Sequence, residues 1–297
     1  MRLEKKATVV STTVAAILVL MKTTVGILSG SIAVLASAID SFLDLIVSMF
    51  NYFALNTAEK NPDDKFNYGK SKLEPLAAVV EGTIISFSAI FILYEALVKI
   101  AHPREMSFMQ SSIWVMAASL IITLGLVLFL NFVAKKTNNM VIKADALHYK
   151  TDLLSNGAIL LALALIAYTG EQLIDPILGV LIALYMIYSA IPIIKDGILM
   201  LLDVALPEED IQRIQDVLES EELNDYHYLK TRISGSHIFI SVHAVFNVSV
   251  SLYDAHLVAD RVEAKIKALF DDNKIVHTLI HMDPYDDSEI NDTEEGY

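Results

Sequence analysis

The stretch SIAVLASAIDSFLDLIVSMFNYFAL, residues 31–55, is apolar apart from a few small polar residues, Asn51 and two carboxylates, Asp40 and Asp44. Its length exceeds the roughly 20 residues that a helix needs to cross the hydrocarbon core of a bilayer. Residues four apart lie on one face of a helix, so both carboxylates point to the same side. The stretch therefore predicts a transmembrane helix with one functional polar face.

Five other stretches resemble it in length, and the chain of 297 residues is 54% hydrophobic with a mean hydropathy of +0.50. These values exclude an ordinary soluble protein and indicate an integral membrane protein. Arg2, Lys5 and Lys6 precede the first stretch, as in a signal peptide, but its apolar core exceeds the roughly 7 to 15 residues of such a signal. We therefore expect six spans, at 7–28, 32–54, 73–100, 113–134, 144–168 and 173–194.

Basic residues alternate between the two sides of these spans. The segment before the first span and the loops after the second and fourth spans are rich in lysine, whereas the other loops carry few basic residues. The positive-inside rule then places both termini in the cytoplasm. The basic residues that decide this orientation are Arg2, Lys5, Lys6, Lys60, Lys65, Lys70, Lys72, Lys135, Lys136 and Lys143.

The last third of the chain differs in charge from the rest. From Leu201 onward it holds 21 acidic residues and 7 basic ones, so it carries the whole net charge of −14. An acidic domain argues against nucleic acid as a partner and suits cations. We expect a six-helix transport domain at 1–206, a cytoplasmic metal-binding domain at 207–285 and a disordered acidic tail at 286–297.

The pattern within the cytoplasmic part predicts a small α+β domain. Pro207 and the three acids after it begin a helix, and Ser234-Gly235-Ser236 separates two alternating stretches as the turn of a hairpin does. Such an order suits an open sheet with two helices on one face. The expected α-β-β-α-β order comprises a helix from 207, strands at 226–233 and 237–246, a helix at 252–270 and a strand at 274–282.

The fifth predicted span carries a second spaced pair, His148 and Asp152, again four residues apart. A charged residue near the middle of a span costs at least about 2.5 to 3.5 kcal/mol on insertion scales, so such groups usually serve a pathway. Together with Asp40 and Asp44 they form a plausible ligand set for Zn²⁺, while Fe²⁺, Mn²⁺, Co²⁺ or Cd²⁺ also fit the ligand types. The chain has no Cys, which disfavours copper(I). The alternative is a set of inter-helix hydrogen bonds or a buried ion pair.

Four other polar residues within the spans stay without an assigned role. Asp145 and Asn156 share the face of His148 and Asp152, and either can line the route or pack beside the ligands. Glu81 in the third span can relay protons, pair with Lys22 of the first span, or face a polar cavity. The sequence does not choose among these roles.

Three segments resemble the cation diffusion facilitator family, especially its bacterial branch of ferrous-iron and zinc efflux proteins. They are GSIAVLASAIDSFLD at 30–44, KADALHYKTD at 143–152 and DVALP at 203–207. The resemblance covers nearly the whole chain. It implies a homodimeric metal/proton antiporter of the bacterial inner membrane that moves metal out of the cytoplasm. It also implies a ferredoxin-like cytoplasmic domain and a transport site formed by Asp40, Asp44, His148 and Asp152.

The resemblance implies a second metal site in the cytoplasmic domain, and the strand pattern supports part of it independently. His281 and Asp283 are two apart on one predicted strand, so both side chains project to the same side, and His243 faces away from the apolar side of the hairpin. We expect a binuclear Zn²⁺ or Fe²⁺ site there, although a single strand histidine is more often an exposed polar residue. The expected ligands are His227, His243, His256, His281 and Asp283, while His237 and His277 stay outside the assignment.

The loop PDDKFNYGKSK at 62–72 departs from the family pattern. The efflux branch places an Asp and two His before a Gly-Lys element, but here Phe66 and Lys70 stand where those His would sit. Only Asp63 is retained. We therefore expect metal binding by this loop to be absent or weak.

Two other classes of protein compete with a transporter. A metal-responsive receptor or scaffold would need only the cytoplasmic ligands, so it leaves the four ionisable groups in the spans unexplained. An intramembrane hydrolase would need an H-E-x-x-H helix or a serine nucleophile elbow, and the sequence contains neither. We therefore expect no enzymatic activity and no organic cofactor.

Overall fold

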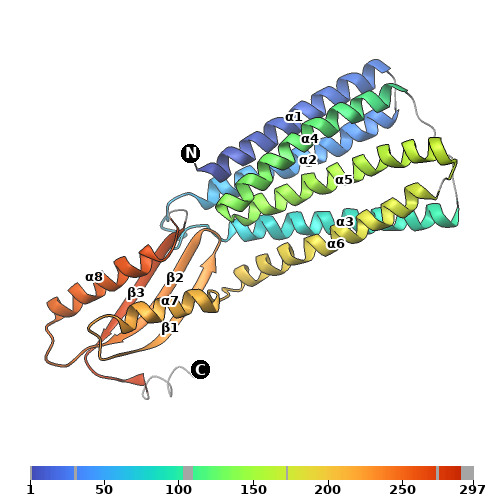
Figure 1. Cartoon of the computed structure of the whole chain (residues 1–297). Coiled ribbons are helices and arrows are strands. Elements are labelled where there is room, and N and C mark those ends of the chain that lie inside the picture. Colours follow the sequence, from blue (N-terminus) through green and yellow to red (C-terminus); the bar gives the residue numbers. More distant parts are fainter. Residues whose placement is uncertain (1, 30–31, 103–109, 172, 272–273, 289–297) are drawn as a thin grey trace. The chain divides into compact units, whose positions relative to one another are not determined.

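The computed structural model describes residues 2–29, 32–102, 110–171, 173–271 and 274–288 of the chain. The chain divides into two compact units, Met1–Ile198 and Leu199–Tyr297. Six long helices come first and an α-β-β-α-β unit follows, so the predicted fold class is confirmed (Figure 1).

All six long helices are long and apolar enough to cross a membrane, which makes the chain a multi-pass membrane protein. Each of them extends past its predicted apolar stretch at one end or both, because a helix can continue through residues that are not apolar. One begins at Met140, where the Asn139 side chain accepts hydrogen bonds from the first-turn amides and caps the helix. The helices are α1 (Leu3–Ser29), α2 (Ile32–Ala58), α3 (Leu73–Ala101), α4 (Gln110–Thr137), α5 (Met140–Thr169) and α6 (Ile174–Leu201).

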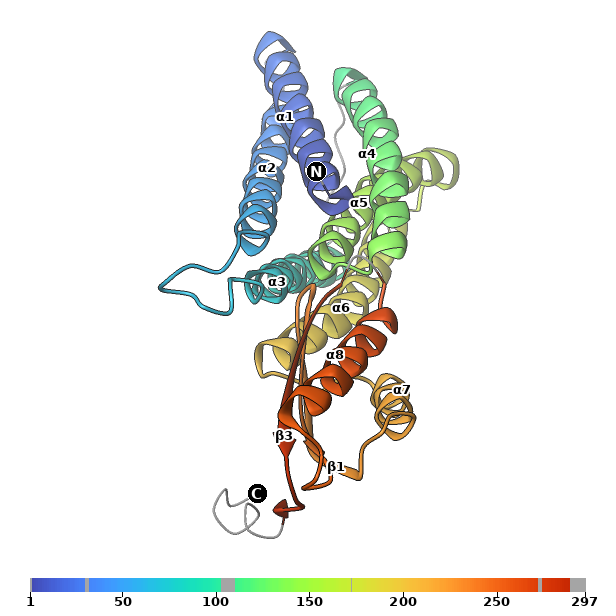
Figure 2. The ribbon, with the colours of Figure 1, turned by 90° about the vertical axis from the view of Figure 1, so that its left-hand side faces the viewer.

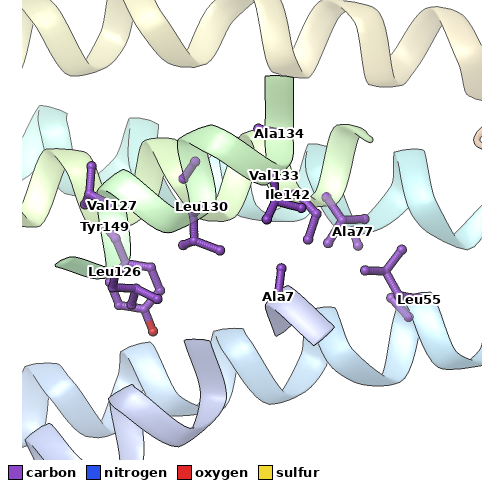
Figure 3. Close-up of a cluster of buried hydrophobic side chains, with 13 residues drawn as sticks. Ala7, Leu55, Ala77, Leu126, Val127, Leu130, Val133, Ala134, Ile142 and Tyr149 are labelled. Atoms are coloured by element: carbon purple, nitrogen blue, oxygen red, sulfur yellow. The ribbon is translucent and has the colours of Figure 1, made fainter. Parts of the chain in front are cut away.

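The first unit is held together by a core that joins five of its helices. Helices α1 and α2 run side by side in both views of the chain (Figures 1 and 2). Between α4 and α5 lies a cluster of buried side chains to which residues of α1, α2 and α3 add (Figure 3). The residues labelled in Figure 3 are Ala7, Leu55, Ala77, Leu126, Val127, Leu130, Val133, Ala134, Ile142 and Tyr149.

Helices α3 and α6 approach closely at two glycines. A Cβ atom on Gly197 would lie 2.5 Å from Val79 Cγ2 and 3.1 Å from the Pro75 carbonyl oxygen. A Cβ atom on Gly82 would lie 2.8 Å from Ile194 Cγ1. Small residues at helix contacts are typical of membrane proteins, since they allow the backbones to pack directly.

The second unit has a three-stranded sheet in the order β1-β2-β3, with β1 antiparallel and β3 parallel to the central β2. Buried residues of β2, including Ile240 and Val242, pack with Ile214 of α7 and Val262 of α8 in one core. The other face of the sheet carries the histidines of the three strands. The elements are α7 (Glu208–Glu219), β1 (Asp225–Ser234), β2 (His237–Val245), α8 (Leu252–Ala268) and β3 (Ile275–Asp283).

Two backbone irregularities shape β1. Gly235 has a φ of 59° in the hairpin turn, a conformation that glycine adopts without strain. The register of β1 against β2 shifts between His227 and Lys230, and Tyr228 within this bulge has a φ of 51°. Bulges redirect side chains, and this one follows directly after His227.

Candidate metal centre

The membrane cluster, defined as Asp44, His148 and Asp152, joins α2 to α5. One ligand atom from each residue lies within 4.8 Å of the others. His148 Nε2 is 3.2 Å from Asp44 Oδ1 and 3.8 Å from Asp152 Oδ2. Ligand atoms around a tetrahedral ion with bonds of about 2.1 Å lie about 3.4 Å apart, so this spacing suits one divalent ion. Asp152 Oδ2 is buried without a hydrogen-bond partner, which is consistent with an oxygen that coordinates a metal ion.

Asp40, the fourth ligand expected from the sequence, is not part of this group. It lies one turn before Asp44 on α2, and a turn of helix rises about 5.4 Å. Asp40 nevertheless lines the same cavity as the three grouped residues. The structure therefore brings three of the four predicted ligands together and leaves Asp40 beside them, so a four-ligand set stays a prediction.

The cavity that contains the membrane cluster has a volume of about 590 Å³. A water molecule occupies about 30 Å³ in the liquid, so an ion can enter with part of its hydration shell. Polar groups from helices α1 to α5 line it beside the ligands, among them Ser41, Ser88 and Asn156. Asn156 Nδ2 donates to the Asp152 carbonyl oxygen at 2.8 Å, which favours a supporting role over a ligand role for this residue.

A direct contact fixes α2 against α5 beside the cluster. The hydroxyl groups of Ser48 and Tyr149 are hydrogen bonded at 2.7 Å, and both side chains are buried. Ser48 lies one turn after Asp44, and Tyr149 is next to His148. The bond therefore holds the two helices of the cluster in register.

The structure separates Lys22 from Glu81, which the sequence allowed to pair. Lys22 of α1 donates to Ser41 Oγ at 2.7 Å and lines the cavity of the membrane cluster. Glu81 of α3 instead accepts a hydrogen bond from Asn51 Nδ2 at 2.9 Å. Lys22 therefore places a positive charge beside the cluster. Spacing along the sequence does not connect this lysine with the metal ligands.

The sheet cluster, defined as His227, His243, Asp283 and Asp287, lies on the face of the sheet opposite to α7 and α8. One ligand atom from each of the four lies within 4.8 Å of the others. His227 Nε2 is 3.2 Å from Asp287 Oδ1 and 3.6 Å from Asp283 Oδ2, and His243 Nδ1 is 2.9 Å from Asp283 Oδ2. These distances approach the edges of a tetrahedron around one ion. His227 Nε2 and Asp287 Oδ1 are buried without hydrogen-bond partners, as donors to a cation would be.

Strand register brings these residues together. His227 of β1 is paired with His243 of β2, which is paired with His281 of β3, so three histidines form a row across the sheet. Asp283 follows His281 by two residues and projects to the same side. A spacing pattern within one strand cannot reveal such a row, because it arises from pairing between strands.

The other two residues expected in this site lie outside the sheet cluster. His281 Nε2 is 3.1 Å from Asp283 Oδ1, and its ring lies 4.6 Å from that of His243, so it borders the cluster. His256 is exposed on α8 and its Nε2 is 3.7 Å from Asp260 Oδ2. Because α8 covers the opposite face of the sheet, the structure does not bring His256 to the other ligands.

Asp287 was missed because it falls in the segment predicted to be disordered. The structure places the first three residues of that segment against β1, where the Tyr228 hydroxyl donates to the Ser288 carbonyl oxygen at 2.8 Å. Asp286 Oδ1 also lies 3.8 Å from His227 Nδ1. The sequence did carry one indication of this, because Asp286 and Asp287 follow the expected ligand Asp283 by only three and four residues. Residues 289–297 of the predicted tail lie outside the described residues.

His237 and His277 form a separate pair on the sheet. Their rings are stacked, and His237 Nδ1 lies 3.0 Å from His277 Nε2. Partial burial, together with the nearby Arg232 guanidinium, lowers the pKa of His277 below its usual value. A permanent cation beside the pair also disfavours a metal ion, so leaving these histidines outside the assignment is consistent with the structure.

In the loop before α3, the single retained acid, Asp63, is hydrogen bonded to other residues of the same loop. Asp63 Oδ2 accepts from Lys70 Nζ at 2.6 Å, and Asp63 Oδ1 accepts from the backbone amides of Lys65 and Phe66. The hydrogen bond from Lys70 leads the interactions that lower the pKa of Asp63. The Lys70 ammonium also lies 4.5 Å from the centre of the Phe66 ring. A lysine therefore holds the position that a metal ion would need.

Comparison with known proteins gives the same two-part division. Residues 8–202 match the family described as "Cation efflux transmembrane domain", and residues 206–285 match "Cation efflux protein, cytoplasmic domain". The chain is 35% identical over 284 residues to proteins named "Cation-efflux pump FieF" from Citrobacter koseri, Escherichia coli and Escherichia fergusonii. The alignment covers 95% of this chain and 93% of each relative. The chain therefore belongs to the cation efflux family, also known as the cation diffusion facilitators.

Proposed function

We propose that this protein exports divalent transition-metal cations, with Zn²⁺ or Fe²⁺ as the principal cargo and Cd²⁺, Mn²⁺ or Co²⁺ as further candidates, in exchange for protons. The observation that carries the proposal is the membrane cluster of Asp44, His148 and Asp152 in a cavity within six membrane-spanning helices. Asp40 joins the cluster as a fourth ligand when the ion is bound. Borderline ligands of this kind suit several divalent metals and do not select one.

Acid–base chemistry links metal to protons at this site. Carboxylates and neutral imidazole bind a metal ion only when they are deprotonated, so loading the site expels protons and protonation expels the ion. If the helices expose the cavity alternately to each side of the membrane, inward proton flow drives outward metal flow. From the positive-inside rule we infer that the lysine-rich loops, both termini and therefore the C-terminal unit lie in the cytoplasm.

We propose that the sheet cluster is a resident cytoplasmic metal site. Its four ligands include Asp287, and His281 can serve a second ion that shares Asp283. The protein acts as a homodimer in a bacterial inner membrane, in keeping with the family of its C-terminal domain. Metal bound to the sheet cluster stabilises the folded domain by mass action, because the unfolded chain lacks this arrangement of ligands.

The test uses the full-length protein in proteoliposomes with a pH gradient. We expect accumulation of Zn²⁺ on the acidic side, loss of accumulation when an ionophore collapses the gradient, and movement of protons in the opposite direction. Competition by Fe²⁺, Cd²⁺, Mn²⁺ and Co²⁺ ranks the cargo ions. Vesicles that bind metal but never accumulate it would instead support a metal-responsive receptor, the alternative function.

A further inference from the structure

A second group of buried carboxylates lies apart from the metal ligands, where α2, α3 and α5 meet. Asn51 Nδ2 donates to Glu81 Oε2 at 2.9 Å and is 3.4 Å from Asp145 Oδ1. All three side chains are almost completely buried, with exposed fractions of 0%, 1% and 0% for Asn51, Glu81 and Asp145. One amide group therefore bridges two carboxyl groups inside the membrane domain.

The hydrogen bonding of this group is incomplete. Asn51 Oδ1, Glu81 Oε1 and Asp145 Oδ2 are buried oxygens without a hydrogen-bond partner. All three are acceptors if both carboxyl groups are ionised, so the arrangement lacks donors. A proton on either carboxyl group changes one of these oxygens into a donor and supplies what is missing.

The charge balance leads to the same result. Two buried carboxylates close together repel each other, and burial penalises each ionised form. Lys22, which lines the neighbouring cavity, donates to Ser41. Among the described residues, the other charged groups that act on the pair are Asp44, His148 and Asp152.

We propose that Glu81 and Asp145, bridged by Asn51, form a proton-binding site that is separate from the metal ligands and carries one of the protons exchanged for metal. The inference rests on the proposed function for its role in transport, but the presence of the proton can be tested without transport. The two carboxyl groups act as one unit that holds one proton when the membrane cluster is empty.

A metal ion suits this group less well than a proton does. None of the three residues belongs to the described lining of the 590 Å³ cavity. Sodium, magnesium or calcium would need about six oxygen ligands, whereas this group offers three unpartnered oxygens. A proton requires only one acceptor and a neighbour to receive the new hydrogen bond.

The position of the pair explains how metal and proton could exclude each other. A divalent ion in the membrane cluster adds two positive charges beside Asp145, which is one turn before His148 on α5. That charge favours the ionised form of the carboxyl pair and releases its proton. The reverse also holds, because coupling between two binding sites is reciprocal.

The first test detects the proton directly. Infrared spectra of the full-length protein in lipid, recorded without metal and then with Zn²⁺, should show a protonated-carboxyl band that disappears when metal binds. Glu81→Gln and Asp145→Asn should each remove this band. Glu74→Gln is the matched control, because Glu74 is also buried on α3 and accepts a hydrogen bond from an asparagine, Asn139, at 2.7 Å.

The second test counts protons per metal ion in proteoliposomes with a pH-sensitive dye. We expect Glu81→Gln to transport metal with about one proton fewer per ion, while Glu74→Gln keeps the parental ratio. An unchanged band and an unchanged ratio in both Glu81→Gln and Asp145→Asn would overturn the proposal. So would a band that responds to Na⁺, since it would indicate a sodium site.

The two tests distinguish failure of this inference from failure of the proposed function. If the parental protein moves no metal, the proposed function fails, but the infrared band still reports whether the pair holds a proton. If one variant does not fold, as judged by size-exclusion chromatography, the other variant and the parental spectrum decide.

Discussion

The two candidate metal sites, the membrane cluster and the sheet cluster, offer the same kinds of ligand but differ in how completely the structure assembles them. The sheet cluster brings four ligand atoms together across the strands and a following segment, and strand register fixes two of its histidines opposite each other. The membrane cluster brings three together across two helices and leaves Asp40 beside them. Ligands that are already in place, as in the sheet cluster, favour tight binding of a resident ion. A ligand that can move away from the ion, as Asp40 can beside the membrane cluster, favours release of a transported ion.

This contrast also concerns the surroundings of the two clusters. The membrane cluster lies in a cavity of about 590 Å³ with the ammonium of Lys22 on its wall. The sheet cluster is closed by Asp287, whose Oδ1 atom is buried against His227. Substitutions at the two clusters and around them test whether the clusters differ in this way.

Replacing Asp44 should have the largest effect, because the membrane cluster has no spare ligand. We expect Asp44→Ala to reduce metal flux driven by a pH gradient by more than about 100-fold, since even changes outside the ligand shell typically cost 10- to 100-fold. Asp196→Ala, at an exposed acid of α6, should transport normally. Flux by Asp44→Ala at the parental rate would show that the cluster is not the transport site.

Replacing Asp287 should weaken metal binding by the sheet cluster without stopping transport. We expect Asp287→Asn to lower the affinity of the C-terminal site for Zn²⁺ about tenfold or more, equivalent to about 1.4 kcal/mol, as measured by calorimetry on the full-length protein. Asp286→Asn, a change in the adjacent exposed acid, is the control and should have a smaller effect. Equal effects of the two substitutions would remove Asp287 from the cluster.

The stability of the C-terminal domain should depend on Glu221 in a pH-dependent way. The Lys265 ammonium, 2.6 Å from Glu221 Oε1, holds the pKa of this carboxyl group below its usual value. A lowered pKa in the folded state adds stability above the unfolded value, about 4.3 for Glu, and this stability is lost as pH falls through the folded value. Lys265 is half exposed, so solvent screening limits the contribution to about 1 kcal/mol or less.

Hydrogen exchange of α8 in the full-length protein measures this contribution. Glu221→Gln should exchange faster than the parent at pH 7, and the difference should shrink below about pH 4. The neighbouring Glu222 is the control, because its side chain is 87% exposed and Glu222→Gln should change little. A difference that grows as pH falls would contradict the sign of the expected effect.

Replacing Asp63 should have the smallest effect, because Lys70 already occupies its carboxylate. We expect Asp63→Asn to leave the number of bound metal ions unchanged and their affinities within about twofold, as measured by equilibrium dialysis. Asp64→Asn should behave in the same way. Loss of one bound ion in Asp63→Asn alone would reveal a third metal site, in the loop before α3.

Helical spacing was enough to predict much of the fold and part of the membrane cluster. His148 and Asp152 are four apart, and long apolar stretches marked all six helices. The same reasoning could have found Asn51, which is seven residues after Asp44 and therefore on the same face of α2. What spacing could not give was its partner, because the contact with Glu81 depends on how α3 packs against α2.

The C-terminal site was harder to predict because it depends on strand pairing and on a segment with little pattern of its own. His243 and Asp283 were found from alternation along single strands, but the row of histidines comes from register. Asp287 lies in a short acidic segment that composition alone assigns to disorder. His256 was expected from the family pattern, and here the fold places it on the outer surface of α8.

The close approach of α3 and α6 at Gly82 and Gly197 has a mechanical consequence. Sliding of one helix past the other is opposed by the side chains of Val79 and Ile194, which lie against the two glycines. We therefore expect α3 and α6 to move as one rigid body. Glu81 is next to Gly82 and would move with α3 and α6, whereas Asn51 and Asp145 belong to other helices. A rotation of α3 and α6 together would then separate the two carboxyl groups and change which groups can receive their proton.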